Sequence, residues 1–209
     1  MVTRRRRSRR FIESFVARPQ FGQDRQGRTI LTTVDRSLST PPPLDGFLPP
    51  ISQIAYVVDN LEQAVLFWAR HMRVGPFRLI PHIRFVESEY RGAFTEFDLS
   101  IALAWREGVE IELMQLHSKA PSIIDHAPPS GGVHHVGIRT SNIIDDERRL
   151  VAAGMRRLQR NVSSTGTETM FFEGPLGLVE LIAVPEGSPH AEKLKQAALI
   201  WDGNDPILA

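Results

Sequence analysis

The sequence predicts an α+β fold in which two βαβββ modules form one curved mixed sheet around a central cleft, with an N-terminal extension and a C-terminal helix. Three observations predict it. The order strand, helix, strand, strand, strand occurs twice between residues 51 and 185. The two first strands align with each other, and so do the two last strands. A single module is too small to bury both faces of its sheet, so the two are expected to share one core.

The N-terminal residues differ from the rest of the chain in charge. The 209 residues carry a net charge of +1, yet residues 1–48 hold ten arginines against four acidic residues (+6) and residues 49–209 hold 15 basic against 20 acidic residues (−5). We interpret residues 1–48 as a basic, proline-containing extension and linker that the folded unit does not need. Two alternatives stay open: an organelle presequence, or an RNA-binding or membrane-surface patch built on a short amphipathic helix after Thr3–Arg10.

The first module is predicted over residues 51–118. Asp59 and Glu62 have the spacing of a capping box, apolar residues then recur at helical spacing, and Gly75-Pro76 ends the helix. The predicted elements are a strand at 51–58, a helix from 61 to 72, and strands at 77–86, 94–105 and 108–114.

The second module is predicted over residues 133–185. Asn142 is its expected helix cap, and Gly154 lies close to the end of that helix. The predicted elements are a strand at 133–140, a helix from 143, and strands at 155–162, 167–172 and 177–182. A proline- and glycine-containing connector joins the modules, so one folded domain is expected at 49–185, followed by a tail at 186–209 with a helix at 191–200.

The repeat pairs four polar residues that lie among apolar neighbours. Gln53 aligns with His135 on the first strands, and Glu112 aligns with Glu180 on the last strands. A buried carboxylate usually pairs or binds a metal ion, and these four side chains converge if first and last strands are adjacent. One imidazole nitrogen, one amide oxygen and two carboxylates suit a single divalent ion such as Zn, Ni, Co, Mn or Mg. The chain has no cysteine, which excludes thiolate sites.

Each residue alone has a plainer interpretation. Taken alone, Gln53 is interpreted as an amide on the face of a strand. Glu112 alone is interpreted as a solvent-side partner of Arg106 or Arg91. Taken as a set at equivalent repeat positions, the four residues favour the metal site.

Five short segments carry a family resemblance over about two-thirds of the chain. They are Gln53–Leu61, Val74–Phe77, Ile111–Met114, Gly132–Gly137 and Leu178–Ile182. In their order and spacing the chain resembles the vicinal-oxygen-chelate (VOC) superfamily, which includes glyoxalase I, methylmalonyl-CoA epimerase, bleomycin-resistance proteins and extradiol dioxygenases. It is most similar to the epimerase/glyoxalase-like subgroup.

The resemblance implies the same metal ligands, because the superfamily places them on the first and last strand of each module. Gln53, Glu112, His135 and Glu180 give an order similar to the glyoxalase I set. The epimerase pattern has a second histidine and one glutamate fewer. Extradiol dioxygenases need two histidines, and His134 is expected to point to the opposite sheet face because strand residues alternate. The dioxygenase reaction is therefore disfavoured.

The resemblance implies a metal-dependent isomerase, epimerase or lyase that removes a proton next to a carbonyl and stabilises the enolate. Glu180 is the expected base and ligand, with Glu112 as its counterpart. The expected substrate is a small molecule with adjacent oxygens: a keto acid, a CoA ester or a thiol adduct. The alternative is a resistance-type protein that binds a small molecule without turnover. Candidate cleft-lining residues are Phe77, Phe97, Trp105, Phe171 and Phe172.

Composition and the resemblance also suggest partners and location. The acidic folded unit gives no basic face for nucleic acid, and no apolar run approaches the roughly 20 residues of a membrane span. We expect a cytoplasmic homodimer, or an organellar protein if the arginine-rich segment is a presequence.

Overall fold

The computed structural model describes residues 20–23, 29–33, 48–175 and 177–208. The chain divides into two compact units, residues 1–47 and 48–209. In the first unit, β1 (Gln20–Gln23) and β2 (Thr29–Thr33) pair as antiparallel strands, where the sequence predicts only a linker. The amphipathic helix predicted after Thr3–Arg10 lies outside the described residues.

Within the described ranges, no helix combines the length and apolar character needed to span a bilayer.

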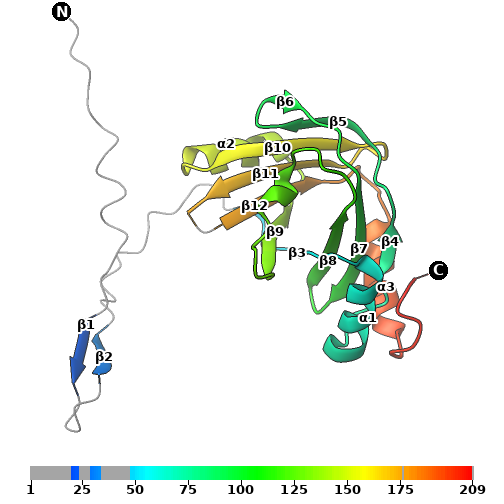
Figure 1. Cartoon of the computed structure of the whole chain (residues 1–209), viewed down its shortest axis with the longest axis horizontal. Helices are drawn as coiled ribbons and strands as arrows, with labels where there is room; N and C mark the ends of the chain where they lie inside the picture. The colour runs from blue at the N-terminus through cyan, green and yellow to red at the C-terminus, as the bar shows by residue number, and fades with distance from the viewer. Residues whose placement is uncertain (1–19, 24–28, 34–47, 176, 209) are drawn as a thin grey trace, which may run out of the picture. The chain divides into compact units, whose positions relative to one another are not determined.

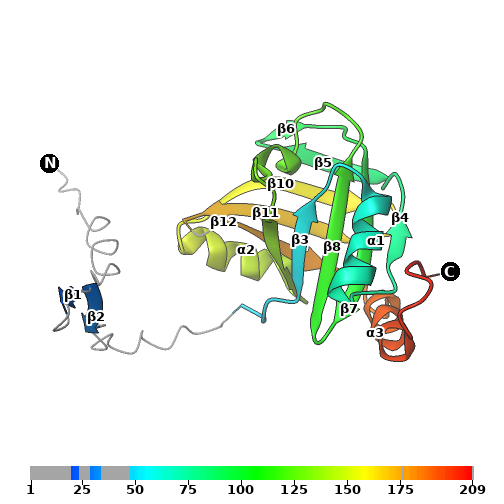
Figure 2. The same cartoon turned by 60° about the horizontal axis from the view of Figure 1, so that its bottom comes forward.

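The second unit is a ten-stranded mixed sheet with helices, which confirms the α+β prediction and its two modules. The strand order is β4-β7-β8-β3-β9-β12-β11-β10-β5-β6. The strands are β3 (Gln53–Val57), β4 (Arg78–Ile80), β5 (Phe85–Tyr90), β6 (Ala93–Phe94), β7 (Leu99–Arg106), β8 (Val109–Leu116), β9 (Val133–Arg139), β10 (Arg156–Ser163), β11 (Glu168–Gly174) and β12 (Gly177–Ala183). The helices are α1 (Leu61–Met72), the 3₁₀ helix η1 (Ile123–His126), α2 (Ile143–Ala152) and α3 (His190–Ile200). Figures 1 and 2 show the sheet curling, with β10–β12 running in a different direction from β7 and β8.

Each module begins its helix with an asparagine. The side chain of Asn60, rather than the predicted Asp59, accepts a hydrogen bond from the Gln63 amide (2.8 Å) at the start of α1. Asn142 caps α2 as predicted, accepting from the Asp145 amide (3.2 Å). An oxygen at this position satisfies a backbone donor that has no partner within the helix.

Alternating strand residues divide the unit into three apolar cores. The convex face of module one packs against α1 in a cluster containing Val65, Phe77, Ala102 and Leu113. The convex face of module two packs against α2 in a cluster containing Ile143, Leu150, Met170, Phe172 and Leu181. The third cluster lies on the concave side and includes Ala55, Leu103, Met114, Ile123, Phe171 and Leu194. Strand residues two apart share a face, so polar residues in register with this third cluster also point into the concave side.

The strand predicted at 77–86 is wrong in one respect. It is two strands, β4 and β5, which lie first and ninth in the ten-strand order. Pro81 and the left-handed His82 (φ 47°) stand between them and interrupt the extended run. β5 pairs with β10 of module two, so residues 81–84 carry the chain from one edge of the sheet to the opposite side.

The C-terminal tail packs on the same unit. Leu194 of α3 is buried in the concave cluster, and the Lys195 ammonium lies 4.7 Å from the centre of the Trp105 ring. Phe77 exchanges backbone hydrogen bonds with Pro206 and Leu208. The tail therefore covers part of module one on its concave side, opposite to α1.

Candidate metal centre

The centre of the sheet brings first and last strands together. β3 pairs with β8 and β9 pairs with β12, both in parallel, while β3 and β9 pair in antiparallel fashion and join the modules. In the parallel pair β3 and β8, Ala55 lies opposite Glu112. In the antiparallel pair β3 and β9, the same Ala55 lies opposite His135. Glu180 lies opposite Gly137, which is also the partner of Gln53.

All four sequence-predicted ligands meet on the concave side. The Nε2 atom of His135 lies 3.0 Å from Glu180 Oε2 and 3.5 Å from Glu112 Oε2. The Gln53 Oε1 atom lies 3.4 Å from the same nitrogen. The His135 imidazole is fully buried, whereas the Glu112 and Glu180 side chains keep 10% and 7% of their surface exposed. The two carboxylates therefore lie nearer to solvent than the imidazole does.

The spacing of these atoms fits a single ion. The ligand atoms of Glu112, His135 and Glu180 all lie within 4.8 Å of one another. Two ligands that each lie about 2.1 Å from an ion are separated by about 3.0–3.4 Å at octahedral or tetrahedral angles. The donor set of imidazole, amide oxygen and two carboxylates also suits a divalent ion.

The electrostatics of the cluster point the same way. Burial raises the pKa of Glu112 well above its usual value, and the neighbouring Glu180 and Glu110 raise it further, against a smaller opposing effect of Arg139. Two carboxylates that share a buried site repel each other. A divalent cation between them would offset both the loss of solvation and the repulsion.

The fold agrees with the family comparison. Residues 52–172 match the family model described as Glyoxalase/Bleomycin resistance protein/Dioxygenase superfamily. The chain belongs to this superfamily. The match runs from β3 into β11 and includes β8 and β9, while β12, with Glu180, follows its last residue.

Solved structures similar to this superfamily member include methylmalonyl-CoA epimerase from Mycobacterium tuberculosis, with 16% identity over 68% of this chain and 91% of that one and a TM-score of 0.46. A hypothetical protein from Bacillus halodurans has 16% identity over 66% and 96% of the two chains (TM-score 0.47). A methylmalonyl-CoA epimerase variant from Streptomyces coelicolor in complex with 2-nitronate-propionyl-CoA has 19% identity over 66% and 99% (TM-score 0.41). No curated protein matches the chain.

Gln53 is held by a residue that the sequence analysis did not single out. Its Nε2 donates to Glu110 Oε1 (2.9 Å), and the same oxygen accepts from Arg139 Nη2 (2.8 Å). Because the carboxylate accepts from the amide nitrogen, the Gln53 oxygen is turned toward His135. Burial raises the pKa of Glu110, with Arg139 opposing that shift. The sequence did contain an indication of this role: Glu110 precedes Glu112 by two positions in one strand, so both side chains are on the same face of the sheet.

Gly137 leaves the space that Gln53 fills. A Cβ atom at this position would lie 2.6 Å from Gln53 Oε1 and 2.9 Å from its Cβ. No side chain larger than hydrogen fits there while Gln53 keeps this conformation, so the glycine helps to define the position of the amide.

The prediction that His134 points away from the site is wrong. Its Nδ1 lies 2.9 Å from the Nδ1 of His135, because the pairing of β9 with β3 is irregular here. Burial lowers the pKa of His134 to about 4, and the neighbouring His135 adds to this shift. His134 is thus a buried neutral neighbour of a candidate ligand.

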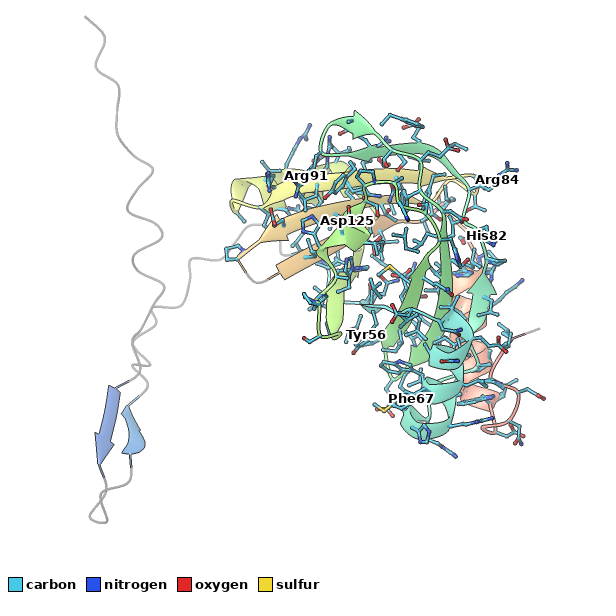
Figure 3. The ribbon with its side chains drawn as sticks, viewed as in Figure 1. Tyr56, Phe67, His82, Arg84, Arg91 and Asp125 are labelled. Carbon is cyan, nitrogen blue, oxygen red and sulfur yellow. The ribbon has the colours of Figure 1, made fainter. Side chains whose placement is uncertain are left out.

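The covering of the cluster comes from the connector between the modules and from β5 of module one. The η1 residues Ile123 and Ile124 are buried in the concave cluster, and Tyr90 of β5 lies 3.0 Å from His126 of η1 through its hydroxyl oxygen. Figure 3 shows the labelled Asp125 of η1 in front of the strands of module two, with Arg91 above it. The connector and the end of β5 therefore cover the same part of the concave side.

The aromatic residues expected to line the cleft divide between the two faces. Phe97, Trp105 and Phe171 belong to or pack against the concave cluster. Phe77 and Phe172 are buried in the convex clusters beside the helices and do not line the cleft.

The single-residue alternatives for Glu112 do not describe its surroundings. Arg106 binds Glu107 and the Arg73 carbonyl, and Arg91 contacts His126. Neither arginine is the partner of Glu112.

Proposed function

We propose that the chain binds one divalent metal ion through Gln53, Glu112, His135 and Glu180 and acts as an isomerase, epimerase or lyase. One observation carries this proposal: two carboxylates from different modules converge on one imidazole nitrogen in a buried site. Membership of the superfamily supports it, because the resemblance places metal ligands at these positions.

The proposed chemistry is the removal of a proton next to a carbonyl group. The bound ion would supply a positive charge that polarises the carbonyl and stabilises the enolate. Glu180 takes the proton from carbon through a carboxylate oxygen. Glu112 comes from the other module and would start the cycle protonated, so it can give its proton to the carbon from a different direction. Glu180 then holds the proton and Glu112 is ionised, and the net change is epimerisation or isomerisation. His135 and Gln53 hold the geometry from the buried side.

The proposed substrate is a small molecule with two neighbouring oxygens. Keto acids have this arrangement, and so do CoA esters and thiol adducts that carry a second oxygen function next to the carbonyl. The Streptomyces coelicolor protein named above binds a CoA compound. Deuterium exchange from solvent at the carbon beside the carbonyl would distinguish these classes without knowledge of the product. Exchange into one class and not the others would assign it.

The metal site is tested by reconstitution with Zn²⁺, Ni²⁺, Co²⁺, Mn²⁺ or Mg²⁺ and measurement of bound metal. We expect about one ion per chain, as single-ion sites of this donor set hold. The His135→Ala variant should lose the bound ion. The control is His117→Ala, at an exposed histidine outside the cluster, which should retain the ion. Metal-free wild-type protein after reconstitution, or a His135→Ala variant that binds normally, would contradict the site.

The base is tested by Glu180→Gln, which keeps an oxygen ligand and removes the carboxylate. We expect a fall of about 10²–10⁴-fold in proton exchange, the usual contribution of a general base. Metal content should stay close to that of the wild type. An exchange-active variant with full metal content would assign the base to another group.

Binding without turnover is the second candidate function. The apolar neighbours of the candidate ligands favour it, such as the Phe171 ring 5.2 Å from the His135 ring, because small-molecule sites combine apolar side chains with a few polar groups. Metal-loaded protein that binds apolar compounds but exchanges no substrate proton would support this alternative.

A further inference from the structure

His134 and His135 are neighbours in β9, yet their rings meet. Ala55 pairs with His135 and Tyr56 pairs with Val133, so His134 is an extra residue in β9 relative to β3. A bulge of this kind changes the direction of side chains that would otherwise alternate across the sheet. It brings the Nδ1 atoms of the two rings to 2.9 Å, which is a hydrogen-bond distance.

The other ring nitrogen of His134 faces an atom that can only accept. Its Nε2 lies 3.0 Å from the carbonyl oxygen of Ile123 in η1. The ring nitrogen must therefore carry the proton and donate it. The Ile123 amide in turn donates to Gln159 Oε1 (2.6 Å), which ties the start of η1 to β10 independently of His134. The acceptor for His134 is thus fixed in place.

The remaining proton positions follow from that contact. His134 is 5% exposed, and in the part of the chain that the structure describes no carboxylate lies within 4.0 Å of it. A charged imidazolium without a partner is unfavourable in such surroundings, so the ring is neutral and its Nδ1 has no proton. The contact between the two Nδ1 atoms is then a hydrogen bond only if His135 donates.

We propose that His134 is a positioning residue that keeps a proton on Nδ1 of His135 and so directs the Nε2 lone pair of His135 toward Glu112 and Glu180. The inference rests on the proposed function in that Nε2 is taken to bind the ion. A ligating histidine commonly donates its other N–H to a neighbouring group, and loss of that group costs about 10–100-fold in metal affinity. Here the neighbour is a second histidine, itself set by a backbone carbonyl.

The opposite arrangement explains why the carbonyl matters. If Nδ1 of His135 had no proton, the hydrogen bond between the two rings would need a proton on Nδ1 of His134. A neutral His134 would then have no proton on Nε2, and the lone pair of that nitrogen would face the Ile123 carbonyl oxygen. Two acceptors would face each other at 3.0 Å in a buried site. A proton shared between His135 Nε2 and Glu180 does not alter this reasoning, because metal binding replaces that proton and leaves Nδ1–H in place.

The first test reads the protonated nitrogen directly. Two-dimensional ¹H–¹⁵N spectra of the histidine rings of the metal-free full chain distinguish Nδ1–H from Nε2–H forms, and His135→Ala assigns the signals. We expect His135 to carry a proton on Nδ1 and His134 to carry one on Nε2. A His135 ring without a proton on Nδ1 would overturn the inference, whether or not the protein binds metal.

The second test compares two variants by their affinity for Zn²⁺ and by the absorption spectrum of bound Co²⁺. His134→Phe removes the acceptor, and we expect metal affinity to fall about 10–100-fold. His134→Asn places its side-chain oxygen where Nδ1 stood, and we expect it to recover most of the loss. His71→Phe, at an exposed histidine of α1, serves as the control and should bind as the wild type does.

The outcomes separate this inference from the proposed function. Equal affinity in wild type and His134→Phe, or equal losses in the Phe and Asn variants with both folded, would overturn the role of His134. Wild-type protein that binds no ion would contradict the proposed function, and the proton positions in the spectra would still decide the inference.

Discussion

Gly137 helps to shape the candidate metal centre through the space it leaves. Its two partners on the adjacent strands are Gln53 and Glu180. A methyl group at position 137 would enter the volume that the Gln53 amide occupies. We expect Gly137→Ala to displace the amide, to weaken metal binding and to lower the free energy of unfolding by about 1–3 kcal/mol, as overpacked sites do. Calorimetric metal titration and denaturant unfolding measure the two effects.

A double-mutant cycle identifies the cause. In a Gln53→Gly background both the amide and the Cβ atom of residue 53 are removed, so Gly137→Ala should cost much less there than in the wild type. Equal costs in both backgrounds would mean that the clash involves another neighbour, such as Ile182, whose Cδ1 would lie 3.0 Å from the added atom.

Residues that repeat could be predicted, and residues that support them could not. Gln53, His135, Glu112 and Glu180 occupy equivalent positions of two modules, so alignment of the chain with itself finds them. Glu110 acquires its importance only from the parallel register that sets it level with Gln53. The bulge at His134 could not be predicted, because buried residues of β9 do not alternate regularly and so give no phase that an extra residue would visibly shift.

At the scale of single elements, β5 is the strand that least resembles its prediction. It lies against β10, where Glu87 and Glu89 stand opposite Val162 and Arg160. Glu89→Pro should remove backbone pairing with β10, because proline lacks the N–H. We expect a loss of about 1–3 kcal/mol, within the usual range for a backbone defect, and faster proteolysis near residues 81–98.

Glu89→Ala is the matched control for that variant. It keeps the backbone donor and removes only a partly exposed carboxylate 3.7 Å from Arg157, an interaction worth roughly 1 kcal/mol or less. Similar unfolding curves for the two variants would contradict a structural role for the pairing of β5 with β10.

The start of α3 gives a pH-dependent element. Burial lowers the pKa of His190 to about 4 from an ordinary 6.5, and the nearby Arg78, Arg139 and Lys193 lower it further. The folded state thus binds this proton less readily than the unfolded state does. The neutral His190 ring therefore contributes to the free energy of unfolding. That contribution is fully present above pH 6.5 and is lost as the pH falls toward 4.

We therefore expect His190→Gln to lose less stability than the wild type between pH 6.5 and pH 4. Thermal unfolding with chelator present measures it, because the chelator removes any contribution from metal release. Parallel curves for the two proteins across this interval would show that protonation of His190 does not weaken the docking of α3.

The helices were more predictable than the strands. Apolar spacing and an asparagine cap specify α1 and α2 locally. The strand run at 77–86 is apolar enough for one strand, but its two halves pair with different partners far apart in sequence. Such pairings depend on the complete sheet, and Pro81 was the local sign of the break.

On the scale of the whole molecule, the candidate metal centre lies where the two modules meet, since its candidate ligands come from both. An ion that binds only the folded state stabilises it by an amount that depends on its concentration, about 2.7 kcal/mol at 100 times Kd. We expect a metal-dependent rise in the unfolding temperature that chelator reverses and that His135→Ala abolishes. A rise of equal size in His135→Ala would place the bound ion elsewhere.

The strand that β5 adds to β10 also determines whether the modules can exist apart. Residues 133–185 expressed alone would leave the backbone groups of β10 that now face β5 without partners. An open strand edge of this kind invites pairing with another chain and promotes self-association. The modules repeat each other in sequence, yet the second is complete only when the first contributes a strand, so neither a fragment nor a simple exchange of halves should give a well-behaved protein.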